Sequence, residues 1–454
     1  MDVFGSSGAR GVANEELTPA FVLRVAKAAG TAWDVPRVAI ARDTRHTGRM
    51  LVDAATSGLA SVGADVDRLG IVPTPGVQAY AEREGVPAIV VTASHNPPEY
   101  NGVKLIGADG VELAVSDLER IEHTLLAESF ADARWDEIGQ VREIDGARRR
   151  YVDALLESVD RERIADAELT VALDPGHGAG SLTSPGFIRA LGCRVVTVNA
   201  QPDGHFPGRN PEPVAENLAE LGQLVRAAEA DVGIAHDGDA DRAIFFDESG
   251  AYLEGDATFA ALAAAELEAG DSLVSAVNVS QRLVDVATEV GADVELTPIG
   301  STNIITRIRE LEAEGRHVPI AGEGNGGIFF PDYRLARDGA YIAARFLELV
   351  AETPASELVA PYDGYANVRE NIEYHSTAER DAMLDAAANH AHTADAELNT
   401  RDGYRLDYGD AWVLARPSGT EPLVRIYAEA RDEDRAETLA GDLYDVLIEA
   451  KGRE

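Results

Sequence analysis

Three carboxylates stand at alternate positions in the segment 236–242, His-Asp-Gly-Asp-Ala-Asp-Arg. Alternate residues of an extended segment point to the same side, and several oxygen ligands together suit a hard cation such as Mg²⁺. Apolar runs flank the segment at 232–235 and 243–246, which places it at the edge of a core. The predicted ligands of one Mg²⁺ per chain are Asp237, Asp239 and Asp241.

Two other interpretations of this segment stay open. In a chain with 79 acidic residues, a cluster of carboxylates can simply be a solvated surface. Acids at the first, third and fifth positions also begin a calcium-binding EF-hand loop, and Glu248 would supply the twelfth. However, Arg242 occupies the sixth position, where that loop needs glycine, so Mg²⁺ is the preferred ion.

A serine follows a second buried strand, predicted at 88–91. Two prolines, Pro97 and Pro98, follow His95 and Asn96 and stiffen the loop, which turns and returns through Lys104. Ser94 is therefore a candidate nucleophile, although it can also be an ordinary serine in a polar loop. Lys104 is one of only three lysines in the chain. It could carry the proton of a hydroxyl group, or it could supply only a compact positive charge.

Three further segments combine glycine with polar side chains. Segment 416–422, Arg-Pro-Ser-Gly-Thr-Glu-Pro, precedes Arg425 and offers backbone N–H groups, hydroxyls and guanidinium groups. These are phosphate-binding groups, although a simple turn is the alternative. Segment 321–327, Ala-Gly-Glu-Gly-Asn-Gly-Gly, could bind sugar hydroxyls, and segment 5–11 carries Arg10 among glycines. Neither of the last two segments indicates a function alone.

The elements that position these segments alternate between strand and helix. Strands are predicted at 36–41, 169–173 and 272–277, followed by helices at 50–62, 185–191 and 281–290. This alternation predicts α/β layers. Residues 423–430 instead alternate between apolar and polar, as in a half-buried strand of an antiparallel sheet, and a helix is predicted at 435–450.

A short sequence recurs within the α/β region. Val-Gly-Ala-Asp-Val at 62–66 is repeated at 290–294, with a looser copy at 191–195. Each copy follows a helix, where glycine suits a left-handed C-cap. The recurrence indicates either three similar units or only the common junction of helix, glycine and strand.

Composition limits the possible environments and partners. A net charge of −39 argues against nucleic acids and anionic membranes as partners. The single cysteine fits a reducing cytoplasm, and no apolar run is long enough for a membrane helix. A dispersed acidic, lysine-poor surface is typical of proteins kept soluble in concentrated salt, so a halophilic host is expected. The sequence does not predict the oligomeric state.

Together and in this order, the five segments resemble the α-D-phosphohexomutase superfamily, which includes phosphoglucosamine mutases and phosphomannomutase/phosphoglucomutases. The resemblance extends from residue 4 to about residue 430. It implies three similar α/β domains and a C-terminal α+β domain around a central active-site cleft. The expected boundaries are 1–145, 146–247, 248–355 and 356–454.

The resemblance also implies roles for individual residues. Ser94 would carry the phosphoryl group as phosphoserine and contribute an oxygen to the Mg²⁺. The groups expected around the reacting phosphoryl group are Arg10, His95, Lys104 and Arg242. The residues expected to contact sugar hydroxyls are Glu323 and Asn325. The residues expected to bind the substrate's second, non-reacting phosphate are Arg416, Ser418, Gly419, Thr420 and Arg425.

The implied reaction moves a phosphoryl group between the 6- and 1-positions of a hexose phosphate through a sugar bisphosphate. Asn325 gives the sugar loop a form often found in archaeal phosphoglucosamine mutases, so glucosamine phosphates are the first expected substrates and mannose or glucose phosphates the second. A sugar-phosphate phosphatase and a non-catalytic sensor are the remoter alternatives. A separate phosphate-binding segment argues against the phosphatase, and the combination of Ser94, Lys104 and three aspartates argues against the sensor.

Overall fold

The computed structural model describes residues 3–5, 8–418 and 421–452. The chain forms two compact units. The first unit comprises residues 1–258 and 325–358, and the second comprises residues 259–324 and 359–454. Within the described residues, no helix has both the length and the apolar character that a membrane span requires.

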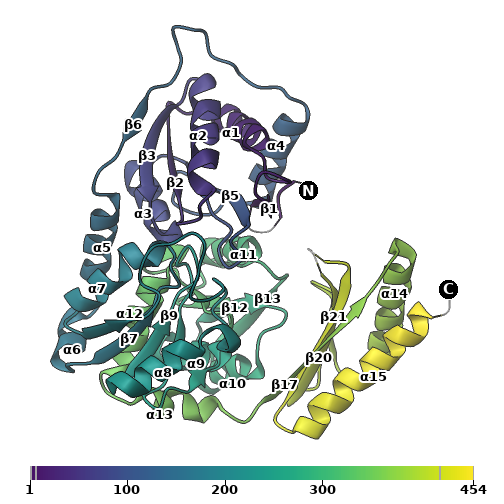
Figure 1. The fold of residues 1–454 in the computed structure, drawn as a ribbon. Helices are drawn as coiled ribbons and strands as arrows, with labels where there is room; N and C mark the ends of the chain where they lie inside the picture. Colours follow the sequence, from purple (N-terminus) through teal and green to yellow (C-terminus); the bar gives the residue numbers. More distant parts are fainter. Residues whose placement is uncertain (1–2, 6–7, 419–420, 453–454) are drawn as a thin grey trace. The chain divides into compact units, whose positions relative to one another are not determined.

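The first unit begins with a six-stranded mixed sheet in the order β1-β5-β4-β2-β3-β6 (Figure 1). Strands β2, β3, β4 and β6 run parallel, and β5 pairs antiparallel with both β4 and β1. The strands are β1 (Ala9–Val12), β2 (Arg37–Arg42), β3 (Asp65–Ile71), β4 (Ala88–Val91), β5 (Tyr100–Ile106) and β6 (Val141–Glu143).

Helices cover both faces of this sheet because its central strand is apolar on both sides. Val38 and Ile40 of β2 pack in one core with α1, α2 and α4, whereas Ala39 and Ala41 pack in another core with α3. Two-sided burial of this kind is typical of parallel strands in α/β layers. The helices are α1 (Pro19–Trp33), α2 (Gly48–Ser61), α3 (Thr74–Glu84) and α4 (Val115–Leu126), with α5 (Ala147–Glu157) and α6 (Arg161–Asp166) following in the chain.

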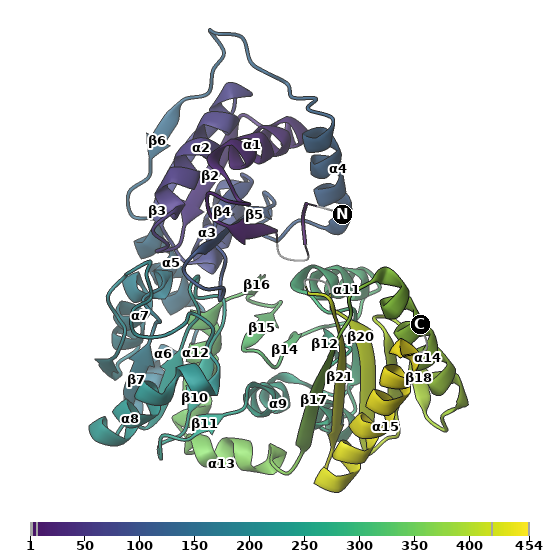
Figure 2. The same cartoon turned by 45° about the vertical axis from the view of Figure 1, so that its right-hand side comes forward.

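A second sheet of the same unit has the order β11-β10-β9-β7-β8. Residues 325–358 return to this unit and add helix α12 (Figure 2). Phe346 of this helix packs against Phe245 of β10, with ring centroids 4.1 Å apart and ring planes tilted by 32°. The elements of this sheet and its helices are β7 (Thr170–Asp174), α7 (Ser184–Ala190), β8 (Arg194–Thr197), α8 (Ala219–Ala228), β9 (Val232–Ala235), β10 (Ile244–Phe246) and β11 (Tyr252–Leu253). The returning segment contains β15 (Gly327–Phe330) and β16 (Arg334–Arg337), which pair antiparallel with each other, and α12 (Gly339–Val350).

The second unit joins a parallel α/β segment to an antiparallel sheet. The parallel strands are β12 (Ser272–Ala276), β13 (Asp293–Thr297) and β14 (Ala321–Glu323), accompanied by α10 (Gln281–Val290) and α11 (Ser301–Ala313). Helix α9 (Gly255–Glu266) leads into this unit, and α13 (Ala355–Val359) leads from the first unit back to it.

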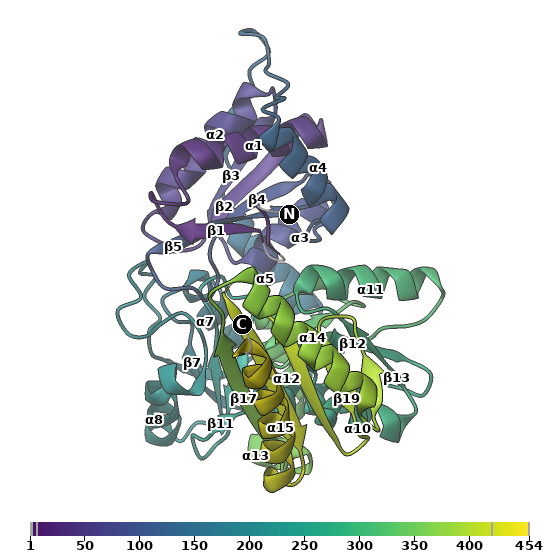
Figure 3. The same ribbon diagram turned by 90° about the vertical axis from the view of Figure 1, so that its right-hand side faces the viewer.

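The C-terminal sheet has the order β17-β21-β20-β19-β18 and is antiparallel throughout. Helices α14 and α15 cover one face (Figure 3), where the alternating apolar residues of β21 are buried. On the other face Trp412 and Leu414 pack against Val277. The elements are β17 (Ala366–Glu373), α14 (Thr377–Thr393), β18 (Glu397–Asn399), β19 (Tyr404–Asp407), β20 (Ala411–Pro417), β21 (Leu423–Ala430) and α15 (Glu433–Lys451).

The predicted fold class is confirmed, since α/β layers with mixed sheets precede a C-terminal antiparallel sheet. The glycine in each copy of the recurring sequence has the predicted left-handed conformation, with φ of 90° at Gly63, 102° at Gly192 and 79° at Gly291. Each of these glycines lies one or two residues beyond the end of a helix and precedes a parallel strand. The recurrence therefore corresponds to the same junction in three α/β layers.

Candidate active site

Ser94 lies just beyond the C-terminal end of β4, a strand whose four residues are all buried. Its backbone has φ of 51°, a left-handed conformation that is uncommon for residues other than glycine. The hydroxyl donates a hydrogen bond to Asp237 Oδ2 at 2.6 Å, and only 2% of the residue is exposed. A strained, buried serine bonded to a carboxylate is consistent with the predicted nucleophile.

Arg45 holds the serine loop in place. Its guanidinium donates to the backbone carbonyl oxygens of Ser94 (2.9 Å), Asn96 (2.6 Å), Pro97 (2.5 Å) and Tyr100 (3.0 Å). The Arg45 side chain is fully buried, and its charge is balanced by Asp43, which lies 3.0 Å from Nε. The loop is thus fixed by an arginine that the sequence analysis did not single out.

The three aspartates come together as predicted. One oxygen from each of Asp237, Asp239 and Asp241 lies within 4.8 Å of the others, and all three residues are buried. Lys104 Nζ donates to Asp239 at 2.9 Å and to Asp241 at 3.1 Å. Arg337, a residue that the sequence analysis missed, donates to Asp241 Oδ2 at 2.8 Å.

The three carboxyl groups differ in their electrostatic surroundings. Burial and the charges of Asp239 and Asp241 raise the pKa of Asp237 to about 8. Burial also acts to raise the pKa of Asp239 and Asp241. The combined neighbouring charges and hydrogen bonds, led by Lys104 at Asp239 and by Arg337 at Asp241, outweigh burial and lower both pKa values. Asp237 is protonated because three carboxyl groups share a small volume and repel one another when ionised. A divalent cation would offset this repulsion and favour the ionised form.

The donor set fits Mg²⁺. Asp239 Oδ1 and Asp241 Oδ1 are buried and have no hydrogen-bond partner among the described residues. Buried carboxylate oxygens normally have a partner, so these two oxygens are available as ligands for a cation. Oxygen atoms are also the ligands that Mg²⁺ prefers. Asp237, Asp239 and Asp241 would therefore hold the ion.

Close backbone packing fixes the aspartate loop against its surroundings. A side chain at Gly238 would collide with the carbonyl oxygen of Ser94 at 2.5 Å, so only glycine lets the two loops approach. Arg209 donates to the carbonyl oxygen of His236 at 2.6 Å and pairs with Asp174 at 3.0 Å. It holds the loop after β9 much as Arg45 holds the loop after β4.

His95, Arg10 and Arg242 accompany the serine. His95 Nδ1 lies 3.4 Å from Ser94 Oγ. The positive charge of Arg242, then burial and the charge of Arg10, lower the pKa of His95 to about 2. The imidazole is therefore neutral near pH 7, and the two arginines are the positive groups of this side of the site. Arg10 is also bonded to Asn96 of the serine loop at 2.9 Å.

For the acid–base hypothesis, the position of Lys104 matters most. Burial alone would lower the pKa of Lys104, but Asp239 and Asp241 outweigh burial and raise it. The ammonium is thus held in the charged form by two predicted metal ligands. This geometry accommodates a compact positive charge, and a role in proton transfer stays a prediction.

The remaining predicted residues are placed separately. Asn325 lies in the first unit, where its Oδ1 accepts a hydrogen bond from Gly327 N at 3.0 Å. Glu323 ends β14 in the second unit. The same unit carries Arg416, which pairs with Asp402 at 3.1 Å, and Arg425, which pairs with Glu421. Ser418 is described, whereas Gly419 and Thr420 lie outside the described residues.

Sequence models of the phosphoglucomutase/phosphomannomutase family match four stretches of the chain. Its α/β/α domains I, II and III match residues 1–132, 149–250 and 254–365, and its C-terminal domain matches residues 369–446. The chain belongs to this family. It is thus a phosphohexomutase and a member of the α-D-phosphohexomutase superfamily.

Individual relatives of this phosphohexomutase carry two kinds of name. A phosphoglucomutase/phosphomannomutase of Thermococcus kodakarensis is 43% identical over 96% of both chains. A second protein of that organism, named a probable phosphoglucosamine mutase, is 38% identical, again over 96% of both chains. The crystal structure of a phosphoglucomutase/phosphomannomutase family protein from Burkholderia thailandensis has a TM-score of 0.87 at 27% identity, covering 99% of this chain and 98% of that one.

Proposed function

We propose that this phosphohexomutase transfers a phosphoryl group from Ser94 to a hexose phosphate and takes the other phosphoryl group back. The main support is the buried hydroxyl of Ser94, which lies 2.6 Å from Asp237. Asp237 belongs to a cluster in which two other carboxylate oxygens have no hydrogen-bond partner among the described residues. A serine in this environment suits a phosphoserine whose oxygen completes the Mg²⁺ site. We propose that the sugar bisphosphate turns over in the active site between the two transfers.

The chain's own residues would supply most of the stabilisation. Arg10, Arg242 and Lys104 would neutralise charge on the transferring phosphoryl group, as positive groups do in other phosphoryl transfers. Mg²⁺ would add Lewis-acid stabilisation of the same charge when bound. The burial of Ser94 limits access of water, which would otherwise hydrolyse the phosphoserine.

We propose that the second phosphate is bound by the C-terminal domain. Arg416, Ser418 and Arg425 lie at or next to the ends of β20 and β21 that face each other across the turn. Glu323 and Asn325 are the proposed contacts to sugar hydroxyls, in keeping with the glycine-rich segment that carries them. Gly419 and Thr420 complete the proposed phosphate-binding segment in the sequence.

Glucose and mannose phosphates are the proposed substrates. The chain shares 43% of its residues with the phosphoglucomutase/phosphomannomutase of T. kodakarensis and 38% with the probable phosphoglucosamine mutase of the same organism. Because both alignments cover 96% of the chain, this difference favours the first pair of sugars. Glucosamine phosphates are the second candidate, supported by Asn325 in the sugar loop.

A substrate panel tests this proposal. The 1-phosphates of glucose, mannose and glucosamine are compared in one buffer with Mg²⁺ and a trace of glucose 1,6-bisphosphate, and the 6-phosphate products are quantified. We expect the highest kcat/KM with glucose or mannose 1-phosphate. A tenfold preference for glucosamine 1-phosphate would reverse the substrate assignment.

The mechanism is tested on the same preparations. Intact mass should show a partly phosphorylated protein, with the phosphate mapped to Ser94, and Ser94→Ala should lose both this phosphate and mutase turnover. Release of inorganic phosphate in step with substrate loss would indicate a phosphatase instead. A phosphate mapped to another residue would refute the proposed role of Ser94.

A further inference from the structure

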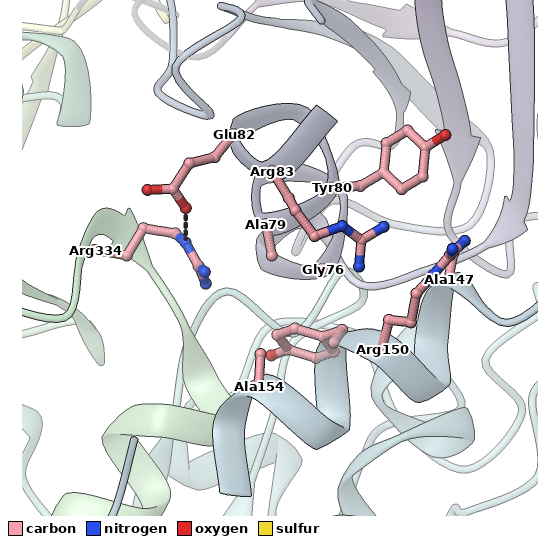
Figure 4. Close-up of a pocket in the computed structure, with 10 residues that line it drawn as sticks. Gly76, Ala79, Tyr80, Glu82, Arg83, Ala147, Arg150, Ala154 and Arg334 are labelled. Carbon is pink, nitrogen blue, oxygen red and sulfur yellow. Dashed lines mark hydrogen bonds and ion pairs between the residues drawn. The ribbon is translucent and has the colours of Figure 1, made fainter. Parts of the chain in front are cut away.

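A cavity of about 330 Å³ lies in the first unit, between α3 and α5 and next to the beginning of β16 (Figure 4). Its polar lining consists of Glu82, Arg83, Arg150 and Arg334, and the remaining lining is tyrosine, alanine and glycine. None of these residues belongs to the proposed catalytic machinery. The cavity is large enough for a small organic molecule.

Positive charge gathers at one end of this cavity. The guanidinium groups of Arg83 and Arg150 lie 5.6 Å and 5.9 Å from the centroid of the same ring, that of Tyr80 (Figure 4). Arg83 also pairs with Glu84, whereas no described carboxylate forms an ion pair with Arg150. Glu84 also attracts Arg150, but two guanidinium groups against one carboxylate leave a net positive charge, which an anion between the two arginines would offset. Such a concentration of arginine is notable in a chain with 79 acidic and 40 basic residues.

The rest of the cavity offers both apolar and hydrogen-bonding contacts. Ala79 and Ala154 come from facing helices, and the small side chains leave the space open. Away from the two arginines, Arg334 Nε donates to Glu82 Oε2 at 2.8 Å (Figure 4). This pair presents both a donor and an acceptor, which suits hydroxyl or amino groups of a ligand.

Two routes of direct contact connect the cavity walls with the aspartate loop. Helix α3, which forms one wall, begins at Thr74, whose hydroxyl donates to Asp239 at 2.6 Å and whose backbone N–H donates to the Asp239 carbonyl at 3.0 Å. Strand β16, which begins at Arg334, ends at Arg337, whose guanidinium donates to Asp241 at 2.8 Å. A ligand that shifts either wall would therefore act on the carboxylates directly.

From this arrangement we propose that the cavity between α3 and α5 is a second ligand site, distinct from the catalytic serine. It binds a small organic phosphate monoester, with the phosphate between Arg83 and Arg150 and the organic part toward Glu82 and Arg334. Occupancy changes the affinity of the aspartate loop for Mg²⁺ through α3 and β16. The site does not depend on which hexose phosphate the enzyme converts.

Calorimetric titration with AMP tests the site, since AMP combines a phosphate monoester with hydroxyl and amino groups. We expect one AMP per chain and at least tenfold weaker binding after combined Arg83→Gln and Arg150→Gln replacement. Ala154→Leu, which fills the cavity without changing charge, should weaken binding similarly. The matched control is Arg149→Gln, because Arg149 is adjacent in α5, is 87% exposed in its side chain and lines a different cavity.

Further measurements distinguish AMP binding in this cavity from AMP binding at the proposed substrate-phosphate segment. Arg416→Gln should leave AMP binding unchanged, because Arg416 belongs to the proposed substrate-phosphate segment. Inorganic phosphate should bind at least tenfold more weakly than AMP if the organic part contributes. Loss of binding in Arg416→Gln, or equal binding by wild type and the pocket variants, would overturn the site. AMP should shift the Mg²⁺ half-saturation of wild type at least twofold, and no shift at saturating AMP would overturn the coupling.

Discussion

Replacing Arg45 by lysine removes the part of the structure that shapes the serine loop while preserving the charge. The guanidinium makes five polar contacts, four to loop carbonyls and one to Asp43. An ammonium has three donors at one point, so at least two contacts are lost. A buried group left without a partner costs about 1–3 kcal/mol, so the loss of stability should be roughly 2–6 kcal/mol.

The same replacement should lower the rate. Ser94 is one of the four residues whose carbonyl Arg45 binds, and a shift of the reacting group by about 1 Å can cost on the order of 10²-fold in kcat. KM should change little, because the proposed substrate-phosphate segment belongs to the C-terminal domain. Phosphorylation of Ser94 by glucose 1,6-bisphosphate should slow in parallel with kcat, which a purely structural role would not require.

Urea unfolding and steady-state kinetics of Arg45→Lys measure both effects. The matched control is Arg68→Lys, which changes an arginine of the same sheet that pairs at the surface with Asp53 and Glu143. Partly exposed pairs contribute about 0–1 kcal/mol, so this variant should resemble wild type. Unchanged stability and unchanged kcat in Arg45→Lys would refute the positioning role.

Three other expectations concern the metal, the lysine and the sugar. A chelator should abolish activity, and Mg²⁺ should restore it. Because the pKa of Asp237 is about 8 without metal, protons compete with Mg²⁺, and the Mg²⁺ concentration for half-saturation should rise as the pH falls from 8 to 6. A half-saturation concentration that does not change with pH would contradict this. If Lys104 acts as an acid or base, Lys104→Arg should lower kcat about 10²–10⁴-fold while the affinities for Mg²⁺ and substrate are retained. A decrease in kcat of less than tenfold would leave only the electrostatic role. Asn325→Ser should change the relative kcat/KM among the three sugars, and a uniform decrease would indicate a structural role.

Sequence patterns predicted the elements well wherever the local signal is strong. The predicted strand 88–91 and the apolar run 232–235 coincide with β4 and β9, whose residues are all buried, and the predicted strand 423–430 coincides with β21. Helix 281–290 coincides with α10, which ends at a left-handed glycine. In each case a continuous apolar run, a strict alternation or a terminal glycine is a local signal with few competing interpretations.

The groups that position the reacting residues were missed because their roles depend on distant contacts. Arg45 binds carbonyls 49 to 55 residues away, and Arg337 binds Asp241 across 96 residues. No local pattern carries such pairings. One signal was available for Arg45, since an aspartate two residues earlier directly follows a buried parallel strand, where α/β proteins gather functional groups.

Some expectations about the site stay predictions. The boundaries at 145, 247 and 355, the roles of individual side chains and the phosphoserine follow from resemblance rather than from geometry. A halophilic host is a further prediction, which unfolding measured at low and high KCl concentrations can test. The buried aspartate cluster is the part of the site that residue spacing alone identified, because alternate carboxylates between two apolar runs have few other uses inside a core.

The discontinuity of the first unit has a consequence for the order of its assembly during synthesis. Residues 259–324 separate Ser94 and the aspartates from Arg337, which belongs to the same compact unit. A nascent chain that ends before residue 325 therefore contains all three carboxylates. Of the two basic side chains that hydrogen-bond to them among the described residues, it contains only that of Lys104. It also lacks Gly339, whose N–H donates to the carbonyl of Ala240 at 3.2 Å. Because domains usually fold as units, the aspartate loop reaches its final geometry only after the chain has returned through β16 and α12. During synthesis the proposed nucleophile is thus made early and the last support of the proposed metal site late, so an incomplete chain lacks part of the proposed site for phosphoryl transfer.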